Sequence, residues 1–278
     1  MNTRLVHFAR SAIRLEFEGE RPAQIVNFLF GAIADSGPAA PHRRYRLLDS
    51  PAGELLADVD DSPAYRHRNP AEMAGWLLGN VGYHLADRSR GGLLFHAGAL
   101  AWGERGLILP GTMGAGKTTL TAWLLTRGFD YLSDELVFVP DQSEQIEALA
   151  RPLNLKRPAR PALAGFVDFD SPSVQILSAH NSDLVLPVVL RPDNRLSQPA
   201  LRQIIFPRYQ PGSELALERL SAAQTGQALM QCLINARNLP GHGFAEIARL
   251  ARQTPACRLT YGGFHQLGSA IEALMAGA

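Results

Sequence analysis

Residues 111–118 read GTMGAGKT, and this stretch matches the pattern G-x-x-x-x-G-K-[ST] at each of its fixed positions. The apolar run Leu107–Leu109 precedes it, and Lys117–Arg127 follows as a predicted helix closed by Gly128. A strand, a glycine loop and the start of a helix in this order surround a phosphate group with backbone N–H groups and a helix N-terminus. The sequence therefore predicts a phosphate-binding loop inside an α/β layer.

The residues of this loop have separate expected roles. The ammonium group of Lys117 can reach the β- and γ-phosphates of a nucleotide, and the Thr118 hydroxyl can ligate Mg²⁺. Among the 27 lysines and arginines only Lys117 and Lys156 are lysines, which favours a function for the lysine in the loop. We expect ATP and Mg²⁺ as ligands. The expected nucleotide-binding residues are Gly111, Gly114, Ala115, Gly116, Lys117, Thr118 and Thr119.

An acidic pair, Asp134 and Glu135, interrupts the strand predicted over Tyr131–Val139. One helix and one returning strand separate this pair from the loop, so both carboxylates can lie beside the phosphates. One carboxylate there can hold Mg²⁺, directly or through water, and the other can take a proton from an attacking hydroxyl. A surface turn between two strands is the alternative interpretation. An acidic pair placed this early after the loop favours a kinase over most P-loop ATPases.

Two further polar residues are weaker candidates for the site. His96 lies in the otherwise apolar strand predicted over Leu93–Trp102, where it is either a satisfied core histidine or a polar group aimed at the site. Arg208 follows the short predicted strand Ile204–Phe206 and could reach the transferring phosphate, with a solvated surface arginine as the alternative. The local sequence decides neither case.

Together these segments resemble the catalytic domain of the HPr kinase/phosphorylase family. The likeness covers residues 90–140 and, in outline, the residues from there to 278, whereas residues 1–69 do not resemble the N-terminal domain of the family. The glycine-rich signature that the true enzymes carry after the acidic strand has no counterpart here, so the closer resemblance is to the HPr-kinase-related proteins, some of which act on precursor peptides or other substrates. The segments that carry the likeness are Phe95-His96-Ala97, Gly106–Leu109 with the loop that follows, Arg127-Gly128 and Ser133-Asp134-Glu135.

The resemblance implies a P-loop fold related to phosphoenolpyruvate carboxykinase, and phosphate transfer to a serine of a protein. It implies that Lys117 binds phosphate and that Thr118 binds phosphate and Mg²⁺. It makes Asp134 the general base toward the acceptor hydroxyl, Glu135 the carboxylate on the metal side, and His96 a contact of the reaction centre. With Arg208 added from its place after a strand, the expected catalytic residues are Asp134, His96 and Arg208, and the expected metal ligands are Thr118 and Glu135.

Three functions stay open at this point. The first is an ATP- and Mg²⁺-dependent kinase that phosphorylates a hydroxyl, with a serine of a protein or peptide as the favoured acceptor. The second is a nucleotide-driven switch or ATPase, and the third is a small-molecule kinase on the same fold. A guanine-specific GTPase is disfavoured because its base-reading motif is Asn/Thr-Lys-x-Asp, and Lys156 stands between Leu155 and Arg157.

Composition narrows the class of protein further. The chain has 278 residues, 46% hydrophobic and 19% charged, which is typical of a soluble globular protein. A net charge of +1 gives no general attraction to nucleic acid or anionic lipid, so we expect neither as a partner. Two cysteines, Cys232 and Cys257, exclude a disulfide framework, and an N-terminus without a signal-peptide pattern favours the cytoplasm. A homo-oligomer stays open.

We expect two regions in an α/β protein. Residues 1–69 are predicted as a smaller β-rich region with one helix, and residues 70–278 as a P-loop kinase domain that begins with a helix capped by Asn69. The proline-rich residues 140–200 are predicted as loops and short strands, with a mobile lid over residues 150–200. Late helices are predicted over Ser221–Arg237 and Phe264–Met275.

Overall fold

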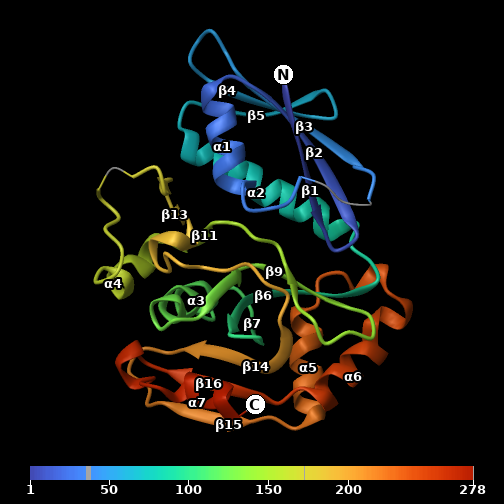
Figure 1. Cartoon of the computed structure of the whole chain (residues 1–278), viewed down its shortest axis with the longest axis vertical. Helices are drawn as coiled ribbons and strands as arrows, with labels where there is room; N and C mark the ends of the chain where they lie inside the picture. Colours follow the sequence, from blue (N-terminus) through green and yellow to red (C-terminus); the bar gives the residue numbers. More distant parts are fainter. Residues whose placement is uncertain (36–38, 172, 278) are drawn as a thin grey trace. The chain divides into compact units, whose positions relative to one another are not determined.

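The computed structural model describes residues 1–35, 39–171 and 173–277. It is a mixed α/β protein whose chain divides into two compact units (Figure 1). Unit 1 comprises Met1–Arg90 and Ala150–Val189, and unit 2 comprises Gly91–Leu149 and Leu190–Ala278. This division differs from the expected one after residue 69, because the first long helix packs on the N-terminal sheet and a later segment returns to the same unit.

Unit 1 contains, in its described residues, a sheet of five strands in the order β1-β2-β3-β4-β5. Neighbouring strands are antiparallel except β2 and β3, which are parallel and joined through helix α1. Side chains such as Ile13, Leu15 and Tyr45 are buried between this sheet and its two helices. The elements are β1 (Asn2–Phe8), β2 (Ser11–Glu18), α1 (Glu20–Phe30), β3 (Arg43–Asp49), β4 (Leu55–Val59), β5 (Ser62–His67) and α2 (Pro70–Asp87).

The returning segment of unit 1 is folded over much of its length. It forms a small sheet in the order β11-β13-β12, and β12 contacts α2. A buried carboxylate, Asp183, is held by two hydrogen bonds of 2.8 and 2.7 Å from Arg160. The predicted lid therefore contains ordered strands, and its residue 172 lies outside the described residues. The elements are β11 (Leu153–Lys156), α4 (Arg160–Leu163), β12 (Ile176–Ser178) and β13 (Ser182–Val185).

Unit 2 is built on a sheet whose order is β10-β9-β6-β7-β14-β16-β15, with β8 also paired to β6. Strands β7, β14 and β16 are parallel, and β6 is antiparallel to β7, β8 and β9. The sheet thus mixes parallel and antiparallel strands. The strands are β6 (Gly92–Trp102), β7 (Arg105–Pro110), β8 (Asp130–Ser133), β9 (Leu136–Pro140), β10 (Glu147–Ala148), β14 (Ala200–Tyr209), β15 (Ala216–Arg219) and β16 (Ala256–Tyr261).

Helices cover the sheet of unit 2 on both faces. Alternate residues of β6, among them Phe95 and Ala97, join a core with side chains of α5 and α6 such as Leu229 and Ile247. Gly98, which follows Ala97, points to the other face of the sheet, where a Cβ would lie 2.6 Å from Thr121 Oγ1 on α3. Successive strand residues face opposite sides, so α3 lies on one face and α5 and α6 on the other. The helices are α3 (Lys117–Thr126), α5 (Ala222–Cys232), α6 (Phe244–Gln253) and α7 (Ala270–Gly277).

The late helices are shorter than the sequence predicted. The capping box of Ser221 and Gln224 is present, but α5 ends at Cys232 because Leu233 forms a bridge to Phe95 of β6. The side-chain oxygen of the buried Asn235 then accepts a hydrogen bond of 3.0 Å from the backbone N–H of Leu94, where a neighbouring strand would offer a backbone carbonyl group. The final helix is divided into a 3-10 turn over Phe264–Gln266 and α7. Among the described helices none combines the length and the apolar character that a membrane span requires.

Candidate functional site

The glycine loop, residues 111–116, joins the end of β7 to the first residue of α3. Gly114 and Gly116 have φ angles of +86° and +90°, a region that side-chain-bearing residues rarely adopt. At Gly111 a Cβ would lie 3.2 Å from the Cβ of Ala115, so the loop closes on itself there. The sequence therefore uses glycine where the backbone must turn, and the turn leads directly into the N-terminus of α3.

Lys117 is folded back over this loop. Its ammonium group donates hydrogen bonds to the carbonyl oxygens of Gly111 at 2.8 Å and of Thr112 at 3.0 Å. Lys117 is only 6% exposed. Thr118 and Thr119 follow it, half-buried, on the first turn of α3. One cation, one hydroxyl and the helix N-terminus therefore gather at the loop, which is the chemistry that an anionic phosphate requires.

The acidic pair occupies a corner between β8 and β9. Ser133 fixes this corner, because its hydroxyl accepts hydrogen bonds from the backbone N–H groups of Glu135 at 3.3 Å and Leu136 at 3.4 Å. Asp134 is 2% exposed, and its Oδ1 accepts a hydrogen bond of 3.1 Å from the Tyr131 hydroxyl. The strand predicted over Tyr131–Val139, with its acidic interruption, is confirmed as β8, this corner and β9.

His96 and Glu135 lie together on the exposed side of the corner. The distance between His96 Nε2 and Glu135 Oε1 is 3.7 Å, and the Glu135 side chain is 40% exposed. Their strands are also joined by a 3.0 Å hydrogen bond from the Ala97 N–H to the Glu135 carbonyl. Because His96 alternates with Phe95 and Ala97, it faces the same side of the sheet as α3. The core alternative for His96 therefore fits the structure less well than a polar group near the loop.

The register of the strands brings these parts to one edge of the sheet. Ala99 of β6 pairs with Ile108 of β7 on one side and with Ser133 of β8 on the other. Two strand spacings, about 10 Å, therefore separate the approach to the glycine loop from the acidic corner. The carboxyl ends of β7 and β8 point the same way because both run antiparallel to β6. Open α/β sheets bind ligands at this edge.

Two tyrosines that the sequence analysis did not single out complete this edge. The N–H of Tyr209, at the end of β14, donates a 3.2 Å hydrogen bond to the Ala115 carbonyl of the loop. A Cβ at Gly116 would lie 3.0 Å from the Tyr209 Cβ and 3.0 Å from the Tyr261 hydroxyl oxygen. Nothing in the sequence around either tyrosine distinguishes it from a core tyrosine near a strand end.

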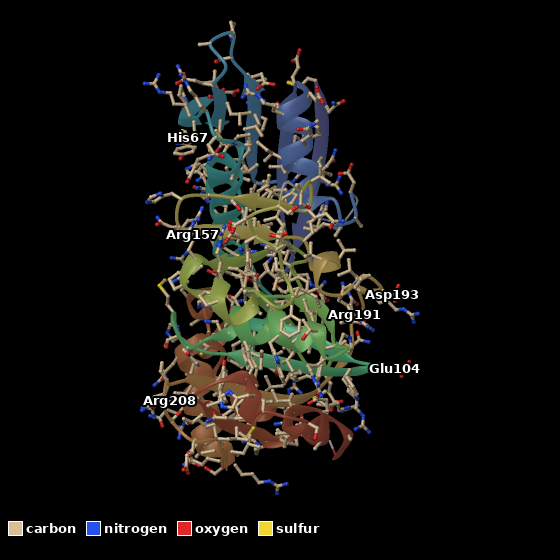
Figure 2. The ribbon with its side chains drawn as sticks, turned by 90° about the vertical axis from the view of Figure 1, so that its left-hand side faces the viewer. His67, Glu104, Arg157, Arg191, Asp193 and Arg208 are labelled. Carbon is tan, nitrogen blue, oxygen red and sulfur yellow. The ribbon has the colours of Figure 1, made fainter. Side chains whose placement is uncertain are left out.

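Arg208 lies at the same strand end but faces the other way. It is exposed, and it pairs across the sheet with Thr260 of β16 (Figure 2). It shares its side of β14 with Ile204 and Phe206, which point into the core beneath α5 and α6. The structure therefore places Tyr209, not Arg208, against the glycine loop.

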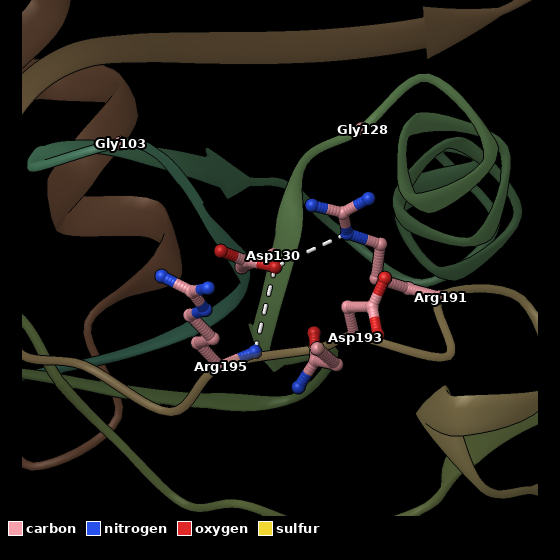
Figure 3. Close-up of a pocket in the computed structure, with 7 residues that line it drawn as sticks. Gly103, Gly128, Asp130, Arg191, Asp193 and Arg195 are labelled. Atoms are coloured by element: carbon pink, nitrogen blue, oxygen red, sulfur yellow. Dashed lines mark hydrogen bonds and ion pairs between the residues drawn. The ribbon is translucent and has the colours of Figure 1, made fainter.

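A polar cavity of about 590 Å³ lies at the opposite edge of the sheet, away from the loop (Figure 3). Asp130, at the start of β8, accepts hydrogen bonds from Arg191 Nε at 3.2 Å and from the Arg195 N–H at 3.4 Å. These bonds hold the segment around Arg191 and Arg195 against the start of β8. The cavity is lined by Gly103, Gly128, Asp130, Arg191, Asp193, Asn194 and Arg195.

The oxygen groups at the loop edge suit Mg²⁺ bound with a nucleotide. Mg²⁺ prefers carboxylate and hydroxyl oxygens and takes most of its ligands from phosphates and water, so the Thr118 hydroxyl and one carboxylate of the acidic pair are enough. Among the described residues no three His, Cys, Asp or Glu side chains form a cluster that could hold a metal ion without a nucleotide. The Thr118 hydroxyl and the acidic pair therefore fit a Mg²⁺ ion that is bound together with a nucleotide.

Comparison with known proteins shows a distant structural likeness. No family model and no curated protein matches the sequence. Among solved structures the chain is similar to the HPr(Ser) kinase/phosphatase from Coxiella burnetii, at 13% sequence identity and a TM-score of 0.33. The match covers 66% of this chain and 94% of that one. At this TM-score the likeness assigns no role to any residue here.

Proposed function

We propose that this chain is an ATP- and Mg²⁺-dependent kinase that transfers the γ-phosphoryl group to a hydroxyl. The observation that supports it best is the shared sheet edge, where the strand that leads into the glycine loop lies two strand spacings, about 10 Å, from the strand that leads into the acidic corner. A phosphate-binding loop alone serves switches and kinases alike. A carboxylate pair across one strand from it supplies the proton acceptor that transfer to a hydroxyl requires.

The reaction divides among groups of this chain. The loop N–H groups and the Lys117 ammonium bind the phosphates and neutralise the charge that develops on the β- and γ-oxygens. Mg²⁺, when bound with the nucleotide, supplies further charge neutralisation. The acceptor oxygen forms a bond to the γ-phosphorus as the bond to the β-γ bridging oxygen breaks. A carboxylate of the corner receives the hydroxyl proton, and ADP leaves.

We assign the base to Asp134 and the metal-side role to Glu135, with the reverse assignment as the alternative. The Tyr131 hydroxyl orients the Asp134 carboxylate at 3.1 Å, a fixed geometry that suits proton transfer. The difference in exposure, 2% for Asp134 and 40% for the Glu135 side chain, is the feature that favours the alternative. His96, 3.7 Å from Glu135 Oε1, contacts the reaction centre in either assignment.

The acceptor we favour is a serine of a protein or peptide, in keeping with the resemblance of residues 90–140. A small-molecule hydroxyl is the second candidate. Incubation of the protein with γ-labelled ATP and a host lysate tests both, when the products are separated into protein and small-molecule fractions. Label in a protein fraction supports the first and label in small molecules the second. Fast ATP hydrolysis without an acceptor, and no labelled product, would instead indicate a switch or ATPase.

Substitutions at the corner test the proposed roles. Asp134→Asn should bind ATP as the parent does and transfer phosphate about 10²–10⁴-fold more slowly, because the amide cannot accept the proton. Glu135→Gln should raise the Mg²⁺ concentration needed for half-maximal transfer. The matched control is Asp141→Asn, at an exposed carboxylate beyond β9, which should change neither quantity.

Other outcomes reassign the roles. If Glu135→Gln abolishes transfer and Asp134→Asn changes only the Mg²⁺ requirement, the two roles are reversed. If both variants transfer at the parent rate, the corner is not the base and His96 becomes the first candidate. Arg208→Ala belongs to the same series. A slower transfer with unchanged ATP affinity would support the catalytic role expected for Arg208 from the sequence.

A further inference from the structure

Four aromatic rings form a column inside unit 2 that ends at the glycine loop. Trp123 of α3 stacks on Phe264 with ring centroids 5.2 Å apart, and Phe264 stacks on Tyr261 at 6.0 Å. The column continues from Tyr261 to Tyr209 at 5.6 Å. Tyr261 is 1% exposed, whereas Tyr209 is 48% exposed. Tyr209 is therefore the exposed end of a column whose other rings are largely buried.

The backbone around Tyr209 ties this open ring to the loop. The Tyr209 N–H donates to the Ala115 carbonyl at 3.2 Å, and the next N–H, of Gln210, donates to the Tyr261 carbonyl at 3.0 Å. The end of β14 is thus held between the glycine loop on one side and β16 on the other. Its ring lies beside Gly116, where a side-chain atom would meet the Tyr209 Cβ at 3.0 Å. The backbone and the Cβ of Tyr209 are therefore held beside the phosphate-binding groups.

We propose that Tyr209 is the platform on which the base of the bound nucleotide stacks. The inference rests on the proposed function, since it takes the loop to hold the phosphates. A half-exposed ring on a backbone anchored next to the phosphate site offers a base one apolar face, and Tyr261 packs behind it with its ring plane tilted by 54°. Stacking of this kind tolerates different bases because every base has a π-face. It supplies nucleotide affinity without requiring hydrogen bonds to the base.

Calorimetric titration with Mg·ATP and with Mg-bound inorganic triphosphate tests the proposal, because only ATP has a base. Tyr209→Ala should bind ATP about 5- to 150-fold more weakly than the parent, the range that loss of one stacked base gives. Its affinity for triphosphate should stay within about twofold, since the loop is intact. Tyr209→Phe keeps the ring and should match the parent for both ligands. The control, Tyr83→Ala, removes an exposed tyrosine of unit 1 and should change neither affinity.

The remaining outcomes separate this inference from the proposed function. An ATP affinity of Tyr209→Ala equal to that of the parent overturns the inference alone. Equal losses of ATP and triphosphate affinity also overturn it, because Tyr209 then only supports the loop through Gly116. Lys117→Ala should weaken both ligands. If the parent binds neither ligand, the proposed function and the inference fail together.

Discussion

Gly98 is the residue whose replacement most directly tests how β6 and α3 build the site. A Cβ at Gly98 would lie 2.6 Å from Thr121 Oγ1, closer than side-chain carbons approach oxygen in folded proteins. Thr121 is fully buried and branched at Cβ, so its hydroxyl has few positions to which it can rotate within the helix. Gly98→Ala therefore forces the Thr121 side chain to turn or β6 and α3 to move apart.

The expected cost follows from two opposing effects. Overpacking a filled core costs about 1–3 kcal/mol. Replacing glycine by alanine inside a strand recovers about 0.5–1 kcal/mol of backbone entropy. We therefore expect Gly98→Ala to lower the free energy of unfolding by about 1 kcal/mol. Because α3 carries Lys117 and Thr118, the same shift should weaken binding of triphosphate to the glycine loop.

A double-mutant cycle with Thr121→Ala measures the contact itself. Thr121→Ala removes the hydroxyl that the new methyl would meet, so in that background Gly98→Ala should be neutral or stabilise by about 0.5–1 kcal/mol. Urea unfolding followed by tryptophan fluorescence is a suitable assay, since Trp102 and Trp123 both lie in unit 2. If Gly98→Ala lowers the free energy of unfolding by the same amount in both backgrounds, the close contact between β6 and α3 is not the reason for glycine at this position.

Two further perturbations act on other parts of unit 2. Lys117→Ala removes hydrogen bonds to the carbonyls of Gly111 and Thr112, so it should weaken Mg·ATP binding by about tenfold or more and lower the free energy of unfolding by about 1.5–3 kcal/mol, with the chain still folded. An unchanged ATP dissociation constant would contradict this. Burial raises the pKa of Cys257 to about 11, so the unfolded chain loses this proton at lower pH than the folded one, and stability should fall as the pH rises from about 9 to 11. Cys257→Ala should reduce that fall by up to about 3 kcal/mol in pH-dependent urea unfolding, and an identical pH profile would show that Cys257 does not cause it.

The parts of the fold that the sequence predicted well are those specified by neighbouring residues. Asn69 caps α2 through a 2.8 Å hydrogen bond from the Ala71 N–H, and the Ser221 capping box starts α5, because both motifs act within one turn of helix. The glycine loop is similar, since its turns, its lysine and its helix start lie within one short segment. Local patterns of this kind need no knowledge of distant strands.

The parts that the sequence did not predict depend on partners far along the chain. Helix α5 ends at Cys232 because Leu233 and Asn235 pair with the start of β6, which lies 141 residues away from Asn235 at Leu94. Residues 150–189 belong to unit 1 through contacts that no local sequence pattern predicts. In each case a tertiary contact overrides a local preference, as helix propensity and turn composition give no information on distant pairing.

The candidate site combines both kinds of information, and this explains which of its residues the sequence could identify. Asp134 and Lys117 belong to short motifs whose chemistry is visible in the residues themselves. Tyr209 belongs to none, because a tyrosine at a strand end is as typical of a core as of a ligand site. It enters the site only because β14 lies parallel to β7 and ends beside the loop, where its N–H meets the Ala115 carbonyl at 3.2 Å. A residue that the strand order brings into the site can be recognised only when that order is known.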